Sequence, residues 1–258
     1  MYKKQLPLIY SLLTIVLLGA IFGLIWHSFI SLEYDWDFSF LWHYLWEPET
    51  NRPGLILQGL WGTLYISALS ILFGSITGIF IGLLLIGKEP FARHAAKLFV
   101  DVFRNTPVLV QLYVFYFIVG TALDLQPETA GILTLSLFCS AYVAEIFRGT
   151  LLEFEKGQID AAKSIGLKPW QIARYVIAPQ ALRRMLPPLV GQFVSLVKDS
   201  SLVSIISVTD LTKSALNVVA VSFRSFETWF VIALIYFALN FLLSSYGRYL
   251  ERRLRIST

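Results

Sequence analysis

The chain has 258 residues and a formal net charge of +4, and only 15% of its residues are charged. Its mean hydropathy is +0.66, whereas about a quarter of the residues of a soluble protein are charged. Its apolar residues gather in long runs, and about 20 consecutive apolar residues cross a bilayer as a helix. Because backbone groups in lipid must bond within the chain, we predict an all-α polytopic membrane protein.

The apolar runs predict about six transmembrane helices. In chain order they cover about residues 6–29, 60–86, 105–123, 129–147, 186–208 and 229–247, and residues 55–59 form an interfacial start before the second. The first run follows Lys3 and Lys4, as in a signal peptide. Its apolar part is too long for a signal core and no small-residue cleavage site follows, so we favour an uncleaved helix.

Lysine and arginine predict the orientation, because they are enriched in cytoplasmic loops. With the N-terminus in the cytoplasm, 17 basic residues lie inside and only 3, namely Arg52, Lys213 and Arg224, lie outside. The opposite topology inverts this ratio. Both termini are therefore predicted to be cytoplasmic, and the basic residues follow the membrane sides rather than forming a nucleic-acid-binding patch.

The second predicted span carries small residues at every third or fourth position, and these share one helical face. They are Thr63, Ser67, Ser70, Gly74, Gly78 and Gly82. The three glycines form two overlapping GxxxG steps, which allow close approach of another helix. We favour a neighbouring span of the same chain over a subunit interface, because the motif is common. The single cysteine, Cys139, lies in an apolar run and is assigned to packing.

A long polar segment, residues 145–188, separates the fourth and fifth spans. QIDAAKSI at 158–165 predicts a short helix, which Gly166 ends. Pro169 then begins a second helix, which we expect Pro179 to limit, while Pro187 and Pro188 open the next span. Two short helices around a glycine bend form a compact knob that a partner can hold in a groove. The alternative is an amphipathic helix resting on the membrane surface.

The knob resembles the EAA motif of ABC-importer permeases. That motif reads Glu-Ala-Ala, three residues, Gly, nine residues, then Ile-x-Leu-Pro. Here DAA at 160–162, Gly166 and VIAP at 176–179 keep the spacing, with conservative departures at Asp160, Val176 and Ala178. FRNTPVLVQLYVFYF (103–117), AYVAEIFRGTLLEFEKGQIDAAKSIGL (141–167) and KDSSLVSIISVTDLT (198–212) are similar to permeases of the polar amino acid uptake branch.

The resemblance covers about residues 57–250 and suggests three parts of the chain. Residues 1–52 form an N-terminal transmembrane helix with an outer loop, which many short members of the branch lack. Residues 53–250 form the ABC permease transmembrane domain, with the EAA coupling loop at 149–185. Residues 251–258 form a cytoplasmic tail.

The resemblance implies a type I ABC importer permease fold and translocation of a polar amino acid across the bacterial cytoplasmic (inner) membrane. The implied partners are ABC ATPase subunits, a second permease subunit, identical or homologous, an extracytoplasmic amino-acid-binding protein and the lipid bilayer. The implied ATPase-coupling residues are Gly157, Asp160, Ala161, Ala162, Gly166 and Pro179. ATP and Mg²⁺ are expected on the partner and no cofactor on this chain, which lacks a GxxxxGK[ST] phosphate loop.

Lys198 and Asp199 interrupt the fifth span. They follow its cytoplasmic end by about twelve residues, which is about 18 Å of helix. Ionisable groups at that depth cost several kcal/mol and face a partner or a wet cavity. A zwitterionic amino acid needs an acceptor for its ammonium and donors for its carboxylate, so both residues, with Ser195, are substrate-pathway candidates. The alternative is a structural ion pair, for instance with Arg104 or Glu145.

Arg104 and Glu145 complete the pathway candidates. Arg104 lies at the cytoplasmic start of the third span and either shapes a gate or anchors at the headgroups, which we favour. Glu145 and Arg148 are three residues apart, so they can pair on one helix face. That pair is as suited to bracing the loop as to touching substrate.

Other classes of function predict features that we do not find. An ion-coupled secondary transporter usually has inverted repeats and paired broken helices. The intramembrane charges and the exposed knob argue against a scaffold without a transport role. An ABC importer for another small solute remains an alternative. His27, His43 and His94 are scattered without metal or catalytic spacing, so the chain is predicted not to be an enzyme.

Overall fold

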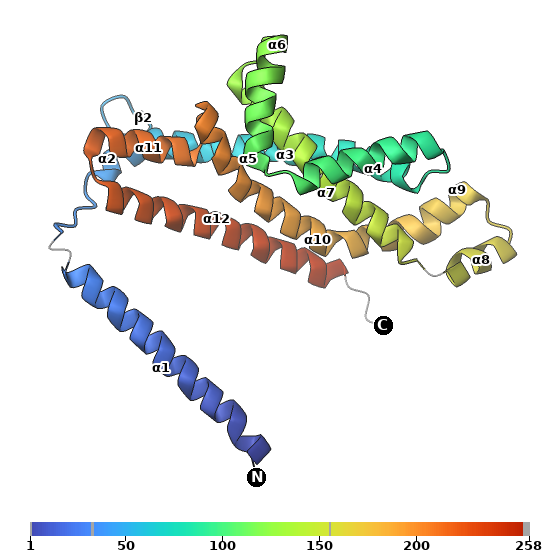
Figure 1. The fold of residues 1–258 in the computed structure, drawn as a ribbon, viewed down its shortest axis with the longest axis horizontal. Helices are drawn as coiled ribbons and strands as arrows, with labels where there is room; N and C mark the ends of the chain where they lie inside the picture. Colours follow the sequence, from blue (N-terminus) through green and yellow to red (C-terminus); the bar gives the residue numbers. More distant parts are fainter. Residues whose placement is uncertain (1, 32–33, 155, 255–258) are drawn as a thin grey trace. The chain divides into compact units, whose positions relative to one another are not determined.

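The computed structural model describes residues 2–31, 34–154 and 156–254 (Figure 1). It divides into two compact units, Met1–Ser39 and Phe40–Thr258. The smaller unit holds helix α1 (Tyr2–Ser31), which includes the apolar stretch Tyr10–Leu24. The side chains of that stretch are exposed, as expected for a helix that lies in lipid. Residues 40–52, which lie outside the family resemblance, belong to the larger unit.

The larger unit is almost entirely helical. Its elements are α2 (Leu41–Leu45), β1 (Trp46–Glu47), β2 (Arg52–Pro53), α3 (Leu55–Ile86), α4 (Pro90–Asn105), α5 (Val108–Tyr113), the π-helical segment η1 (Val114–Gly120), α6 (Thr121–Leu123), α7 (Pro127–Leu152), α8 (Lys156–Ser164), α9 (Pro169–Gln171), the π-helical segment η2 (Ile172–Ile177), α10 (Ala178–Asp199), the 3₁₀ segment η3 (Ser200–Ile206), α11 (Leu211–Ser222) and α12 (Ser225–Leu254). The two short strands pair antiparallel.

The described residues contain four helices that are long and apolar enough to cross a membrane. They are Leu55–Ile86, Pro127–Leu152, the continuous helix Pro169–Ile206 and Ser225–Arg253. The bent pair Pro90–Asn105 and Val108–Leu123 is a candidate fifth, and the apolar stretch of α1 is additional. The predicted all-α polytopic fold is therefore confirmed, and the number of spans agrees roughly with six.

The third predicted span, residues 105–123, corresponds to α5, η1 and α6 (Val108–Leu123), and the sequence did not predict that a separate helix, α4, precedes it at a sharp angle. α4 and α5 meet at an angle of 108°, and α5 to α6 project sideways from the long helices (Figure 1). Pro107 has no N–H to donate and disfavours helical backbone at the preceding residue. Thr106 is accordingly extended, with φ −114° and ψ 143°. The helix ends at this point and a new one begins in another direction.

The prediction that Pro179 limits the second knob helix and that Pro187 and Pro188 open a separate fifth span is wrong, because the two helices are continuous. One helix runs from Pro169 to Ile206 and includes Pro179, Pro187 and Pro188. The turn before Pro179 is π-helical, and the Ala178 N–H donates to the Ala173 carbonyl. This wider turn changes the hydrogen-bond register just before the proline, so the missing N–H does not end the helix.

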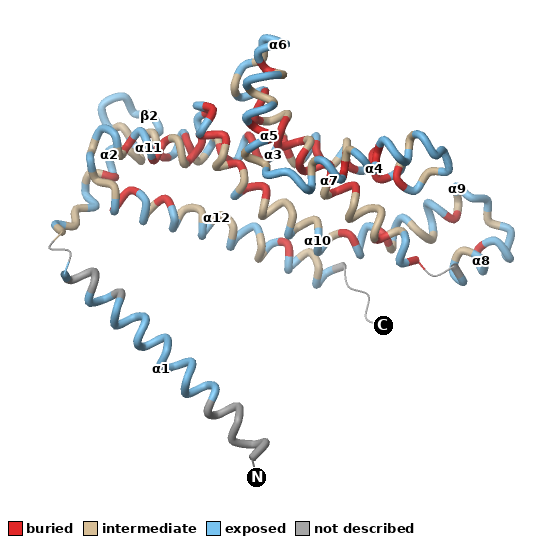
Figure 2. The backbone as a smooth tube through the Cα atoms, in the orientation of Figure 1, coloured by how far each residue is buried: buried red, intermediate tan, exposed pale blue. Residues whose placement is uncertain are grey.

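Close packing of α3 against α7 forms the centre of the larger unit (Figure 2). A Cβ at Gly78 would lie 2.6 Å from Val143 Cβ and 2.7 Å from the Ser140 carbonyl oxygen. A Cβ at Gly74 would lie 2.6 Å from Cys139 Cβ, and Cys139 is fully buried. The small-residue stripe therefore packs within the chain, and the packing role of Cys139 is confirmed.

A buried aspartate organises the opposite end of the unit from the knob. Asp210 Oδ1 accepts from the Lys213 N–H at 2.8 Å and Oδ2 from the Thr212 N–H at 3.0 Å, so this side chain caps α11. Burial raises the pKa of the Asp210 carboxyl above its usual value, and the two N–H donors oppose that rise. The Leu211 N–H donates to Thr63 Oγ1 at 3.0 Å, which joins α11 to α3.

The α3–α7 contact leads to a first prediction. We expect Gly78→Ala to lower the free energy of unfolding by about 1–3 kcal/mol, because an added Cβ forces the two helices apart. Gly191→Ala is the matched control, since no atom lies within 4 Å of its Cβ position. Thermal unfolding of the purified protein in detergent compares the two. Equal stability of both variants would contradict the close packing.

Candidate functional site

The polar loop forms the predicted knob at one end of the long helices. α8 and α9 lie beyond the ends of α7 and α10, and α2 and α11 lie at the opposite end (Figure 1). Phe154, buried at the start of the loop, packs under the Arg184 guanidinium at 4.8 Å from the ring centroid. Gln180 Nε2 donates to Gln158 Oε1 at 3.0 Å and so ties α8 to α10.

Gly166 makes the bend of the knob, as its position in the sequence predicted. Its φ is +81°, a conformation that favours glycine. The Leu167 N–H donates to the Ala162 carbonyl at 3.2 Å and the Gly166 N–H to the Lys163 carbonyl at 2.9 Å. These two bonds form a Schellman motif, which satisfies carbonyls left free at the end of α8.

The second helix of the knob begins at Pro169, as predicted. Gln171 Oε1 accepts from the Lys168 N–H at 2.8 Å and so satisfies a donor that the first helical turn leaves free. The Gly166 bend and this cap fix the angle between α8 and the long helix that follows.

The six predicted coupling residues are spread over both helices of the knob. Ala162 is buried beneath α8, whereas Gly157, Asp160 and Ala161 are exposed on it. Asp160 pairs with Lys163 at 3.1 Å on the exposed face. Pro179 lies in the first turn of α10, separated from the bend by η2. The exposed positions leave a polar surface open to a partner, and their coupling role stays a prediction.

Lys198 and Asp199 lie at the end of α10, where the chain tightens into η3. Lys198 is exposed and Asp199 and Ser195 are half-buried. Within residues 34–154 and 156–254, neither charged group forms an ion pair, so the suggested pairing with Arg104 or Glu145 is not present. Both groups lie on a helix long and apolar enough to cross a membrane, and their role in a solute path stays a prediction.

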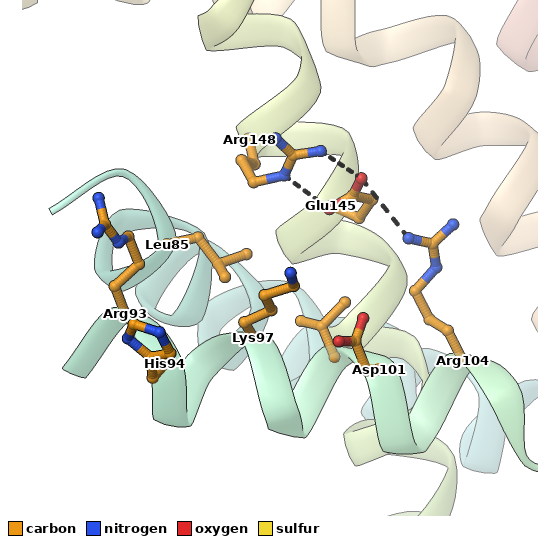
Figure 3. A pocket seen from close by; sticks show the side chains of 9 residues that line it. Leu85, Arg93, His94, Lys97, Asp101, Arg104, Glu145 and Arg148 are labelled. Atoms are coloured by element: carbon orange, nitrogen blue, oxygen red, sulfur yellow. Dashed lines mark hydrogen bonds and ion pairs between the residues drawn. The ribbon is translucent and has the colours of Figure 1, made fainter. Parts of the chain in front are cut away.

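Glu145 is the centre of a separate ionic cluster (Figure 3). Arg148 donates to it twice, from Nε at 2.8 Å and from Nη2 at 2.6 Å. Arg104 Nη1 lies 3.6 Å from Glu145 Oε1 and its guanidinium lies 5.4 Å from the centre of the Tyr142 ring. The predicted pair of Glu145 and Arg148 is confirmed. Arg104 joins it from α4, so two of the pathway candidates are in contact.

The ionic cluster lies beside a pocket of about 450 Å³ between α4 and the ends of α3 and α7. A second hollow, of about 590 Å³, lies near the opposite end of α3 and is lined in part by Trp61, Tyr65, Glu128 and Thr209. In the predicted orientation the first faces the cytoplasm and the second faces outward. Lys198 and Asp199 line neither pocket.

Gln111, which holds the bend between α4 and α5, was not selected from the sequence. This side chain is 7% exposed. Its Nε2 donates to the carbonyls of Phe103 at 2.9 Å and Thr106 at 3.0 Å and lies 2.8 Å from Thr106 Oγ1. The carbonyls that the Pro107 break leaves without helical donors are thus satisfied. A polar residue four positions after a proline, within an apolar run, was the available signal.

Comparison with known proteins gives the class of the chain. Residues 70–256 match the family model described as "Binding-protein-dependent transport system inner membrane component". The Glutamine transport system permease protein GlnP of Escherichia coli K12 is 39% identical over 205 residues, which cover 78% of this chain and 94% of the relative. GlnP of Shigella flexneri matches with the same identity and coverage.

Solved structures agree with this class. A crystal structure of an amino acid ABC transporter with histidines matches with a TM-score of 0.72 and 36% identity, covering 77% of this chain and 94% of that chain. The MetNI methionine ABC transporter in an inward-facing conformation matches with a TM-score of 0.68 and 22% identity, covering 78% and 97%, and supports the fold alone.

The chain therefore belongs to the family of binding-protein-dependent transport system inner membrane components, the permeases of ABC importers. It is a membrane-spanning transport subunit of the type I importer fold and not an enzyme. The resemblance inferred from the EAA spacing is confirmed at this level.

The bend at Gln111 leads to a second prediction. Gln111→Leu removes the side-chain donor to the Phe103 and Thr106 carbonyls, so we expect a loss of about 0.5–1.5 kcal/mol in the free energy of unfolding. Gln126→Leu, at an exposed amide just before α7, is the control. Thermal unfolding in detergent measures both. If the two variants unfold at the same temperature, the Gln111 amide does not stabilise the bend.

Proposed function

We propose that this chain is the permease subunit of an ABC importer that carries a polar amino acid, with glutamine as the first solute to test, across the bacterial cytoplasmic membrane. The observation that carries the proposal is the 39% identity to GlnP over 94% of that relative. The similarity to an amino acid ABC transporter of known structure, at 36% identity, supports the same class of solute.

In this proposal ATP is hydrolysed by a separate subunit that grips the knob. The exposed side of α8, around Asp160 and Ala161, would contact the ATPase, and Gly166 would fix the angle between that contact and the long helix. Mg-ATP binds on the partner. A binding protein delivers the solute from outside, and a second permease subunit completes the path.

The solute path would include Lys198, Asp199 and Ser195. Ionised groups inside a membrane are costly unless they meet a counterion or water. An amino acid supplies both signs, so its ammonium would pair with Asp199 and its carboxylate with Lys198. Arg104 and Glu145 already bind each other, so in this proposal they hold α4 against α7 near the inner end of the path.

Coupling through Gly166 is testable with a matched pair of variants. Gly166→Ala places a Cβ at φ +81°, which costs about 1–2 kcal/mol and disfavours the bent knob. We expect ATP hydrolysis stimulated by binding protein and solute to fall roughly five- to thirtyfold, with weaker co-purification of the ATPase. Gly149→Ala, at a helical glycine with no atom within 4 Å of its Cβ position, is the control. Identical behaviour of the two variants would rule out the bend as the coupling element.

The solute path is tested by uptake of labelled glutamine into proteoliposomes that hold the complete transporter. We expect Asp199→Asn and Lys198→Gln each to reduce uptake at least about tenfold, because each removes one charge from a desolvated contact, while the ATPase still co-purifies. Asp124→Asn, at an exposed carboxylate, is the control. Lost assembly in either path variant would assign these residues to structure, and unchanged uptake would remove them from the path.

A further inference from the structure

The pocket beside α4 contains basic side chains that the proposed transport cycle does not use. Arg93, His94 and Lys97 lie along α4 and line the pocket, together with Arg104 in the last turn of the same helix and Arg148 of α7 (Figure 3). The His94 ring nitrogen Nδ1 is 2.7 Å from the Pro90 carbonyl oxygen, so the ring is held near the start of the helix.

The charges that line this pocket do not balance. Four basic side chains, two arginines and a lysine from α4 and an arginine from α7, face only two carboxylates, which leaves a net charge of +2. Arg148 and Arg104 share Glu145. Arg93 and Lys97 form no ion pair with any residue that the structure describes. The pocket therefore suits an anion with more than one oxygen acceptor, such as a phosphate group.

α4 presents three different faces. Ala96 and Val100 are buried, in a cluster with Leu85 of α3. The charged residues follow along the pocket side. Next to that charged stripe, at the 100° rotation of successive residues, lies an apolar stripe that is exposed: Phe91 at 86%, Leu98 at 67% and Val102 at 48%. A ligand in the pocket thus has cations on one side and an apolar surface directly beside them.

The pocket lies at the depth of one membrane face. It is bounded by Leu85 near the end of α3 and Arg148 near the end of α7, which are both cytoplasmic ends in the predicted orientation. Basic side chains at the cytoplasmic surface attract the anionic lipids of the inner leaflet.

From this combination we infer that the pocket binds the headgroup of an anionic phospholipid of the inner leaflet. Arg93 and Lys97 contact its phosphate, and its acyl chains follow Phe91, Leu98 and Val102. The Asp101 carboxylate, which also lines the pocket, accepts hydrogen bonds from headgroup hydroxyls. The lipid links α4 to the ends of α3 and α7 without taking part in the solute path.

Native mass spectrometry of the complex in which the full-length chain is isolated tests this inference. The complex is equilibrated with equal amounts of phosphatidylglycerol and phosphatidylethanolamine, and the retained lipids are counted. We expect the unaltered complex to retain phosphatidylglycerol preferentially. Arg93→Gln with Lys97→Gln should weaken that retention at least about tenfold, because two of the basic side chains that attract the headgroup are removed.

The control is Lys88→Gln with Arg252→Gln, two exposed basic residues of the same predicted membrane side that do not line the pocket. Retention unchanged by this pair supports a specific site. Equal loss in both double variants would mean attraction by general surface charge, and no preference for phosphatidylglycerol would mean no anionic site. Displacement of the lipid by millimolar inorganic phosphate would assign the pocket to a soluble anion. Each of these three results would overturn the inference.

Discussion

The close approach of α3 and α7 is the contact on which the rest of the larger unit depends. Glycines at 74, 78 and 82 remove the side chains that would keep the two backbones apart, and Cys139, Val143 and Phe147 fill that space. In a bilayer, helices do not associate by excluding water, so contact area and close packing must hold them together. α4 then packs across the same two helices through Ala96 and Val100.

The parts of this fold that were predictable are those encoded locally. Apolar runs fixed most of the long helices, and Gly166 and Pro169 fixed the bend of the knob, because a left-handed glycine and a first-turn proline act within a few residues. The stripe of small residues also predicted a close helix contact. That α7 is the helix in contact with this stripe is evident only from the structure.

The effect of each proline on its helix could not be predicted from the sequence. Pro107 and Pro179 have the same chemistry, yet the first ends a helix and the second lies inside one. The difference lies in the neighbours: a π turn before Pro179 shifts the hydrogen bonds past it, and Gln111 satisfies the carbonyls released at Pro107. Neither the π turn nor the Gln111 hydrogen bonds produce a repeating pattern of residues that a sequence could reveal. Charge pairing was predictable for Glu145 and Arg148, which are one turn apart, and not for Arg104, which reaches them from another helix.

The continuity of the helix Pro169–Ile206 has a mechanical consequence for the proposed importer. Its 38 residues span roughly 57 Å at 1.5 Å per residue. The knob lies at one end and Lys198 and Asp199 lie near the other, so both candidate sites belong to one rod. Had Pro179 ended the helix, a force on the knob would have been absorbed by a flexible joint. In the proposed importer, a rod supported by α7 and α12 would instead transmit a tilt at the ATPase contact as a displacement of Lys198 and Asp199, without a separate relay.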